Sequence, residues 1–82
     1  MKKLHLGCGY QFIEGWINTD IRSDLVSDPL IDYLDVTKTF PFDSEEIDYI
    51  FTEHLIEHID YLKGLNMLIE SYRVLKPNGK IR

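Results

Sequence analysis

Short apolar runs that stop at glycine or at an acidic residue recur along the first two thirds of this chain. Runs of four to six residues rich in β-branched and aromatic side chains, bounded by turn residues, are typical of strands. Four such runs are predicted as strands: Lys3–Leu6, Trp16–Ile21, Leu30–Leu34 and Ile47–Phe51. The first stops at Gly7, the second contains Asp20 near its end, and the third is closed by Asp35. This pattern predicts an α/β chain in which polar groups gather where strands end.

The last third of the sequence predicts a helix followed by a fifth strand. From the candidate N-cap Asp60 onward, apolar residues recur at spacings of three and four, as the buried face of an amphipathic helix requires. These residues are Leu62, Leu65, Leu68, Ile69, Tyr72 and Leu75. Lys76-Pro77-Asn78-Gly79 is expected to end the helix, and Lys80-Ile81-Arg82 to begin the strand. Ser23–Pro29 is interpreted as a loop, and Thr37–Glu46 as a surface turn.

Composition limits the function classes. The 82 residues allow one domain, residues 1–82, and the net charge of −5 with scattered basic residues does not indicate nucleic acid binding. The apolar runs are too short to span a membrane. A single cysteine, Cys8, excludes an internal disulfide, so we expect a cytoplasmic protein.

Glycine and acidic residues after the predicted strands suggest a nucleotide site. Gly7-Cys8-Gly9 lets backbone N–H groups approach a ligand closely, although a plain tight turn has the same residues. Asp20 can accept hydrogen bonds from a ribose diol, as an acid at this position does in nucleotide-binding α/β folds. Asp35 would lie on the same sheet edge and could face an adenine amino group, or it could simply form a turn.

Four segments together resemble the class I S-adenosylmethionine-dependent methyltransferases, and in particular a subgroup described as predicted methyltransferases. These segments are Leu4-His5-Leu6-Gly7-Cys8-Gly9, Gly15-Trp16-Ile17-Asn18-Thr19-Asp20-Ile21, Phe51-Thr52-Glu53-His54-Leu55-Ile56-Glu57-His58 and Val74-Leu75-Lys76-Pro77-Asn78-Gly79-Lys80-Ile81. The resemblance covers nearly the whole chain. It implies a Rossmann-like, mostly parallel sheet, as a truncated three-layer methyltransferase fold that is a partial cofactor-binding domain.

The resemblance also implies a set of site residues and a reaction. Gly7 and Gly9, with Cys8 between them, would hold the methionine end of S-adenosylmethionine. Asp20, with the adjacent Ile21, would bind the ribose hydroxyls. The remaining expected contacts are Asp35 and Val36 beside the adenine, and Glu53 and His54 after the fourth strand. The reaction would be methyl transfer to an acceptor that the sequence does not identify, mainly by proximity and orientation, and no metal is expected. His54 and His58 are the only nearby candidates for a general base.

The sequence departs from the family pattern near the first strand. His5 replaces the usual acid two residues before the first glycine, and Gln11 stands at the usual third glycine. The link from Gly9 to Trp16 is short for a parallel crossover, so we expect its helix to be reduced to a turn or two.

Three other functions are compatible with parts of the sequence. The chain could be a module that binds S-adenosylmethionine or another nucleotide without catalysis. An NAD-dependent oxidoreductase also has a glycine loop and a second-strand acid, but G-x-G-x-x-G is absent and position 12 is Phe. His54-Leu55-Ile56-Glu57-His58 matches the zinc-peptidase motif H-x-x-E-H, yet it directly follows a strand instead of lying on a long helix.

The expected fifth strand would have an open edge, and open edges pair with other chains. We therefore predict that the chain associates with itself or with a partner through this edge. Light scattering at high concentration checks this, and a clean monomer would contradict it.

Overall fold

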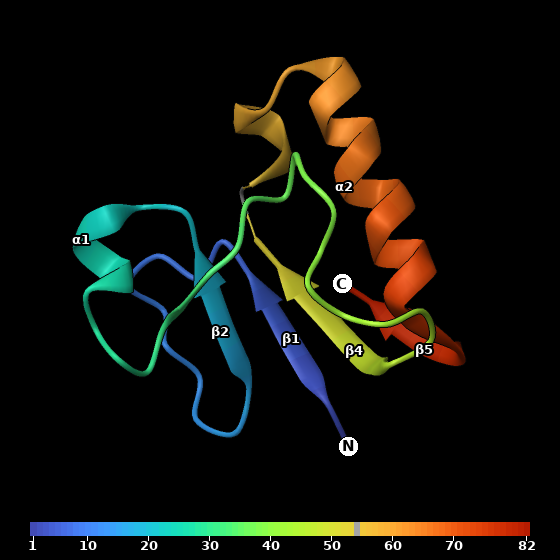
Figure 1. The fold of residues 1–82 in the computed structure, drawn as a ribbon, viewed down its shortest axis with the longest axis horizontal. Coiled ribbons are helices and arrows are strands. Elements are labelled where there is room, and N and C mark those ends of the chain that lie inside the picture. Colours follow the sequence, from blue (N-terminus) through green and yellow to red (C-terminus); the bar gives the residue numbers. More distant parts are fainter. Residues whose placement is uncertain (54) are drawn as a thin grey trace.

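A five-stranded sheet forms the centre of the molecule (Figure 1). The structure is a computed structural model that describes residues 1–53 and 55–82. The strand order is β3-β2-β1-β4-β5, and every pairing in the described part of the chain is parallel. The strands are β1 (Lys3–Leu6), β2 (Ile17–Asp20), β3 (Asp32–Tyr33), β4 (Ile47–Thr52) and β5 (Leu75–Ile81). The expected Rossmann-like, mostly parallel sheet is confirmed.

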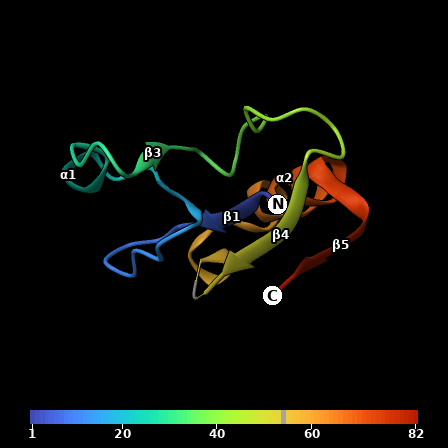
Figure 2. The same ribbon diagram turned by 90° about the horizontal axis from the view of Figure 1, so that it is seen from below.

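The helices differ greatly in length. α2 (Tyr61–Val74) has 14 residues, whereas α1 (Ser23–Val26) has four and a 3₁₀ helix (Ile56–His58) has three. Asp60 is the N-cap of α2, as predicted, because its side chain accepts a hydrogen bond from the Lys63 N–H at 3.2 Å. Figure 2 shows α1 and β3 at one end of the molecule and β5 at the other.

The predicted buried face of α2 is wrong. The residues that α2 buries are Gly64, Met67, Glu70, Ser71 and Val74. Five of the six residues predicted for that face lie instead on the exposed side, namely Leu62, Leu65, Leu68, Ile69 and Tyr72. Both sets have helical spacing, so apolar periodicity alone selected the wrong one.

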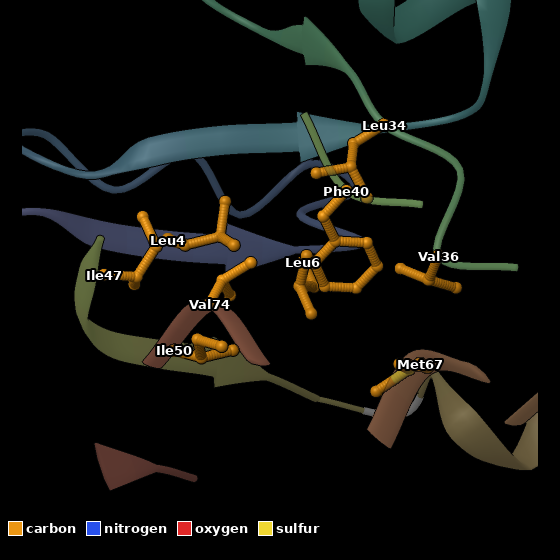
Figure 3. Close-up of a cluster of buried hydrophobic side chains, with 9 residues drawn as sticks. All are labelled: Leu4, Leu6, Leu34, Val36, Phe40, Ile47, Ile50, Met67 and Val74. Carbon is orange, nitrogen blue, oxygen red and sulfur yellow. The ribbon is translucent and has the colours of Figure 1, made fainter. Parts of the chain in front are cut away.

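Nine buried apolar residues form the main core, which lies between the sheet, α2 and the segment that links β3 to β4. They are Leu4, Leu6, Leu34, Val36, Phe40, Ile47, Ile50, Met67 and Val74 (Figure 3). Phe40 is only 2% exposed, so the expected surface turn at residues 37–46 is wrong at this position. Figure 3 shows its ring directed into the cluster, where it anchors the link between β3 and β4.

Glu70 and Arg73 fasten this link to α2. The Glu70 carboxylate accepts a hydrogen bond from the Phe40 N–H at 2.7 Å and from Arg73 at 2.8 and 3.0 Å. Arg73 in turn donates to the carbonyl oxygens of Phe40 and Phe42. The Arg73 guanidinium lowers the pKa of the Glu70 carboxyl. A buried carboxylate is thus kept charged because each of its oxygens has a donor.

Three further segments differ from their predictions. Ser23–Pro29 is not all loop, because α1 forms where Leu25 packs against Cys8 and Ile31. β3 is shorter than the predicted Leu30–Leu34. β5 begins at Leu75, which already pairs with Ile47, so the predicted turn is a bulge within the strand.

Replacing Glu70 tests the attachment of the link. Glu70→Ala leaves the buried Phe40 N–H without a partner, and we expect it to lower the free energy of unfolding by about 1–3 kcal/mol. Chemical denaturation measures this. Glu14→Ala, at an exposed carboxylate, is the control, and equal losses in the two variants would contradict the assignment.

The same carboxylate predicts part of the pH dependence of stability. A carboxyl whose pKa is lowered by folding stabilises the protein fully above its unfolded pKa, and that contribution is lost as pH falls through the lower folded value. For Glu70 the loss begins near the ordinary value of 4.5 and continues below it. Urea denaturation from pH 6 downward should show a shallower decline for Glu70→Gln than for the wild type. Parallel curves would rule out this contribution.

Candidate functional site

A cavity of about 210 Å³ lies at the carboxyl end of the sheet, beside the ends of β1 and β2. Because all strands are parallel, the segments that follow β1, β2 and β3 converge on this edge (Figure 1). The cavity is lined by Gly7, Asp20, Ile21, Leu34, Asp35, Val36, Thr37, Leu55, His58 and Ile59. Ligands of open α/β sheets bind at this position.

Six of the ten lining residues were named from the sequence. The structure brings together Gly7, Asp20, Ile21, Asp35 and Val36, and His58, a candidate base, also lines the cavity. Cys8 does not line it. The Cys8 side chain is buried with Leu25 and Ile31, and burial, with a smaller effect of the Asp20 carboxylate, raises its pKa. Gly9 and Glu53 are also outside the lining, and His54 lies outside the described residues.

The Asp20 carboxylate connects the glycine loop to the segment after β2. Oδ2 accepts a hydrogen bond from the Gly9 N–H at 2.9 Å, and Oδ1 accepts from the Ile21 and Arg22 N–H groups at 2.8 and 3.0 Å. A carboxylate has about four acceptor positions. Oδ2 therefore retains one position for a further donor. Asp20 can bind one hydroxyl of a diol without giving up a backbone partner.

Asp35 forms a turn, and it also lines the cavity. Its Oδ1 accepts from the Thr37 hydroxyl at 2.6 Å and from the Thr37 N–H at 2.9 Å. These hydrogen bonds, with the hydroxyl contributing most, lower the pKa of Asp35. Asp35 is thus an anion at neutral pH and can accept a hydrogen bond from an amino group.

The two glycines of the first loop have different surroundings. Both have positive φ angles, +61° at Gly7 and +54° at Gly9, which favour glycine. A Cβ at Gly7 would lie 2.8 Å from Leu55 Cδ2, whereas a Cβ at Gly9 would meet no atom within 4 Å. The Leu55 side chain therefore occupies the space beside Gly7. A ligand that extends to Gly7 would require Leu55 to turn aside.

Asn18 holds the loop between β1 and β2, and sequence analysis did not assign it a role. No helix is present in residues 7–16, so the expected turn or two of helix is wrong. The Asn18 amide instead accepts from the Ile13 N–H at 3.0 Å and donates to the carbonyl oxygens of Ile13 and Trp16 at 2.8 and 3.1 Å. One side chain replaces the hydrogen bonds that a crossover helix would make.

His5 completes this arrangement on the neighbouring strand. It is 1% exposed, and its Nδ1 lies 2.9 Å from Asn18 Oδ1. Because Asn18 Nδ2 donates to two carbonyl groups, Oδ1 must be the acceptor, so His5 Nδ1 carries the proton. His5 thus has a structural partner at the position where the family usually has an acid.

The geometry does not favour the two rival enzymes. His58 lies in a 3₁₀ helix of three residues rather than a long zinc-binding helix. Within residues 1–53 and 55–82, no group of three or more His, Cys, Asp or Glu side chains is placed to hold a metal ion. The glycine loop also lacks a following helix whose N-terminus could bind a dinucleotide pyrophosphate.

The fold is that of a Rossmann-like α/β domain, with a cavity at the carboxyl end of its sheet. A family model described as a methyltransferase domain matches residues 18–82. The chain therefore belongs to the methyltransferase-domain family, and the resemblance to class I methyltransferases is confirmed. A search of curated proteins found no match.

Solved structures share the fold of this chain. The PH0226 protein of Pyrococcus horikoshii OT3 is similar over 98% of this chain, with a TM-score of 0.80 and 25% identity. A protein of Methanococcus maripaludis assigned as an S-adenosyl-L-methionine-dependent methyltransferase gives 0.69 and 18% over 98% of the chain. The methyltransferase CalH, solved with SAH, gives 0.65 and 17% over 95%. The chain spans 46%, 45% and 30% of these proteins, respectively.

None of the helices in the described ranges is long and apolar enough to cross a membrane.

Asn18→Leu tests the loop between β1 and β2. The substitution keeps a similar volume but removes the partner of His5 Nδ1 and of the Ile13 backbone, so we expect a loss of at least about 2 kcal/mol in unfolding free energy. Gln11→Leu, at an exposed position of the same loop, should change it by less than about 0.5 kcal/mol. Denaturant titrations of both variants check this, and an Asn18→Leu variant as stable as the wild type would refute the role of Asn18.

Proposed function

We propose that residues 1–82 act as one S-adenosylmethionine-binding unit that supports methyl transfer to an acceptor. The observation that carries the proposal is the convergence of Gly7, Asp20, Ile21, Asp35 and Val36 on one cavity at the carboxyl end of the sheet. Membership of the methyltransferase-domain family supports the same conclusion. When bound, S-adenosylmethionine supplies a methyl group made electrophilic by its sulfonium sulfur.

The cavity residues divide the binding between them. Asp20 Oδ2 has one remaining acceptor position, which suits a ribose hydroxyl. Asp35 can accept from the adenine amino group, while Ile21 and Val36 provide apolar contact with the ring. The open space at Gly9 suits the methionine end, and binding beside Gly7 requires the Leu55 side chain to turn aside.

Catalysis in this proposal depends mainly on orientation. The chain holds the methyl donor in a fixed direction, which lowers the entropic cost of attack by the acceptor. His58 lies at the cavity and is the described residue best placed to accept a proton from that acceptor. His54 remains a predicted contact. We also propose a cytoplasmic location, in keeping with a single cysteine held as a buried thiol.

Calorimetric titration with S-adenosylhomocysteine, the demethylated product, tests the proposal. We expect saturable binding with one site per chain, and no binding of NAD or zinc under the same conditions. Binding of NAD alone would overturn the methyltransferase assignment. Binding without turnover of any acceptor would support a binding module instead.

A bulky substitution in the cavity tests where S-adenosylhomocysteine binds. Ile21 is 52% exposed and lines the cavity, so Ile21→Trp should fill the cavity without disturbing the core. We expect at least a tenfold loss of affinity for S-adenosylhomocysteine. Leu30→Trp, at a side chain 67% exposed and outside the lining, is the matched control. Unchanged affinity in Ile21→Trp would place the cofactor elsewhere.

A further inference from the structure

The outward face of α2 is apolar along its whole length. We call the six side chains on it the α2 stripe: Tyr61, Leu62, Leu65, Leu68, Ile69 and Tyr72. Their exposed fractions run from 37% at Leu65 to 86% at Tyr72. Because they are spaced by three, four and seven residues, they adjoin one another on the helix surface.

The α2 stripe is too large to be an ordinary monomer surface. Taking about 150–250 Å² for a large side chain, the stripe exposes roughly 700 Å² per copy. The largest apolar patch of a typical monomer is about 300–600 Å². A stable dimer buries about 800 Å² on each partner. The stripe therefore has close to the area that one standard interface needs.

The pattern and charge of the stripe fit a second copy of the same helix. Tyr61, Leu65, Leu68 and Tyr72 follow one another at spacings of four, three and four, which is the spacing of a coiled-coil seam. The stripe contains no charged residue. Two charged residues of α2 outside the stripe, Glu70 and Arg73, form hydrogen bonds to the link between β3 and β4. Two copies can therefore meet without like charges facing each other.

We propose that the chain forms a two-fold dimer in which the α2 stripes of two copies pack against each other. Two antiparallel helices place Leu65 and Leu68 at the centre and bring Tyr61 of each copy beside Tyr72 of the other. A two-fold contact uses the same patch on both copies and closes on itself, so no larger assembly follows. This surface is distinct from the edge of β5, through which the sequence predicted association.

Sedimentation equilibrium of the 82-residue chain tests the dimer. We expect a dimer that dissociates on dilution, and Ile69→Glu should raise the dissociation constant at least 100-fold because it buries a charge in the α2 stripe, directly beside the seam. Tyr72→Lys, at the most exposed side chain of the stripe, should raise the dissociation constant in the same way. It provides an independent test if Ile69→Glu does not fold. Leu30→Glu introduces the same charge at a comparably exposed apolar residue outside the stripe and should have no effect.

The other outcomes overturn the proposal. A wild-type monomer at all concentrations would mean that something other than a second copy covers the stripe. A dimer that survives both stripe substitutions would assign association to another surface, such as the edge of β5. Equal dissociation by Leu30→Glu would show a non-specific effect of charge, and circular dichroism establishes that each variant is folded.

Discussion

The Asp20 carboxylate is the interaction on which the rest of the site depends. It gathers N–H groups from the glycine loop after β1 and from the residues after β2, so two strand ends are fixed to each other. Asn18 also holds the loop between β1 and β2, because its side-chain amide bonds both the N–H and the carbonyl oxygen of Ile13. These side-chain bonds pair the N–H groups of Gly9 and Ile13, which the backbone hydrogen bonds of the loop do not pair.

The sequence predicted those parts of the fold that depend on local chemistry. The end of β1 follows from Gly7, and the N-cap at Asp60 follows from a short polar side chain before an apolar run. Gly7, Asp20 and Asp35 could be grouped from their positions along the chain because parallel strands present their carboxyl ends at one edge. Gly7 and Asp20 could therefore be recognised from their residue type and their place at the end of a predicted strand, without knowledge of the packing.

The remaining features depend on contacts between distant residues, which periodicity does not record. α2 has two faces with helical spacing, and the buried one contains Glu70, whose carboxylate bonds the link between β3 and β4. Phe40 lies in a polar turn sequence yet enters the core. Asn18 was hidden within a strand, and only its proximity to Ile13 and His5 gives it a role. Leu55 occupies space beside Gly7 that the glycine pattern assigned to the cofactor.

Binding of a nucleoside cofactor at the carboxyl end of this sheet is tested most directly by amide chemical shifts, measured by NMR during titration with S-adenosylhomocysteine. We expect saturable shifts at Gly7, Gly9, Ile21 and the segment from Asp35 to Thr37, with little change at residues such as Tyr49 and Lys80, which lie outside the cavity lining. Shifts confined to Tyr49, Lys80 and their neighbours, or none at saturating ligand, would contradict binding at this site.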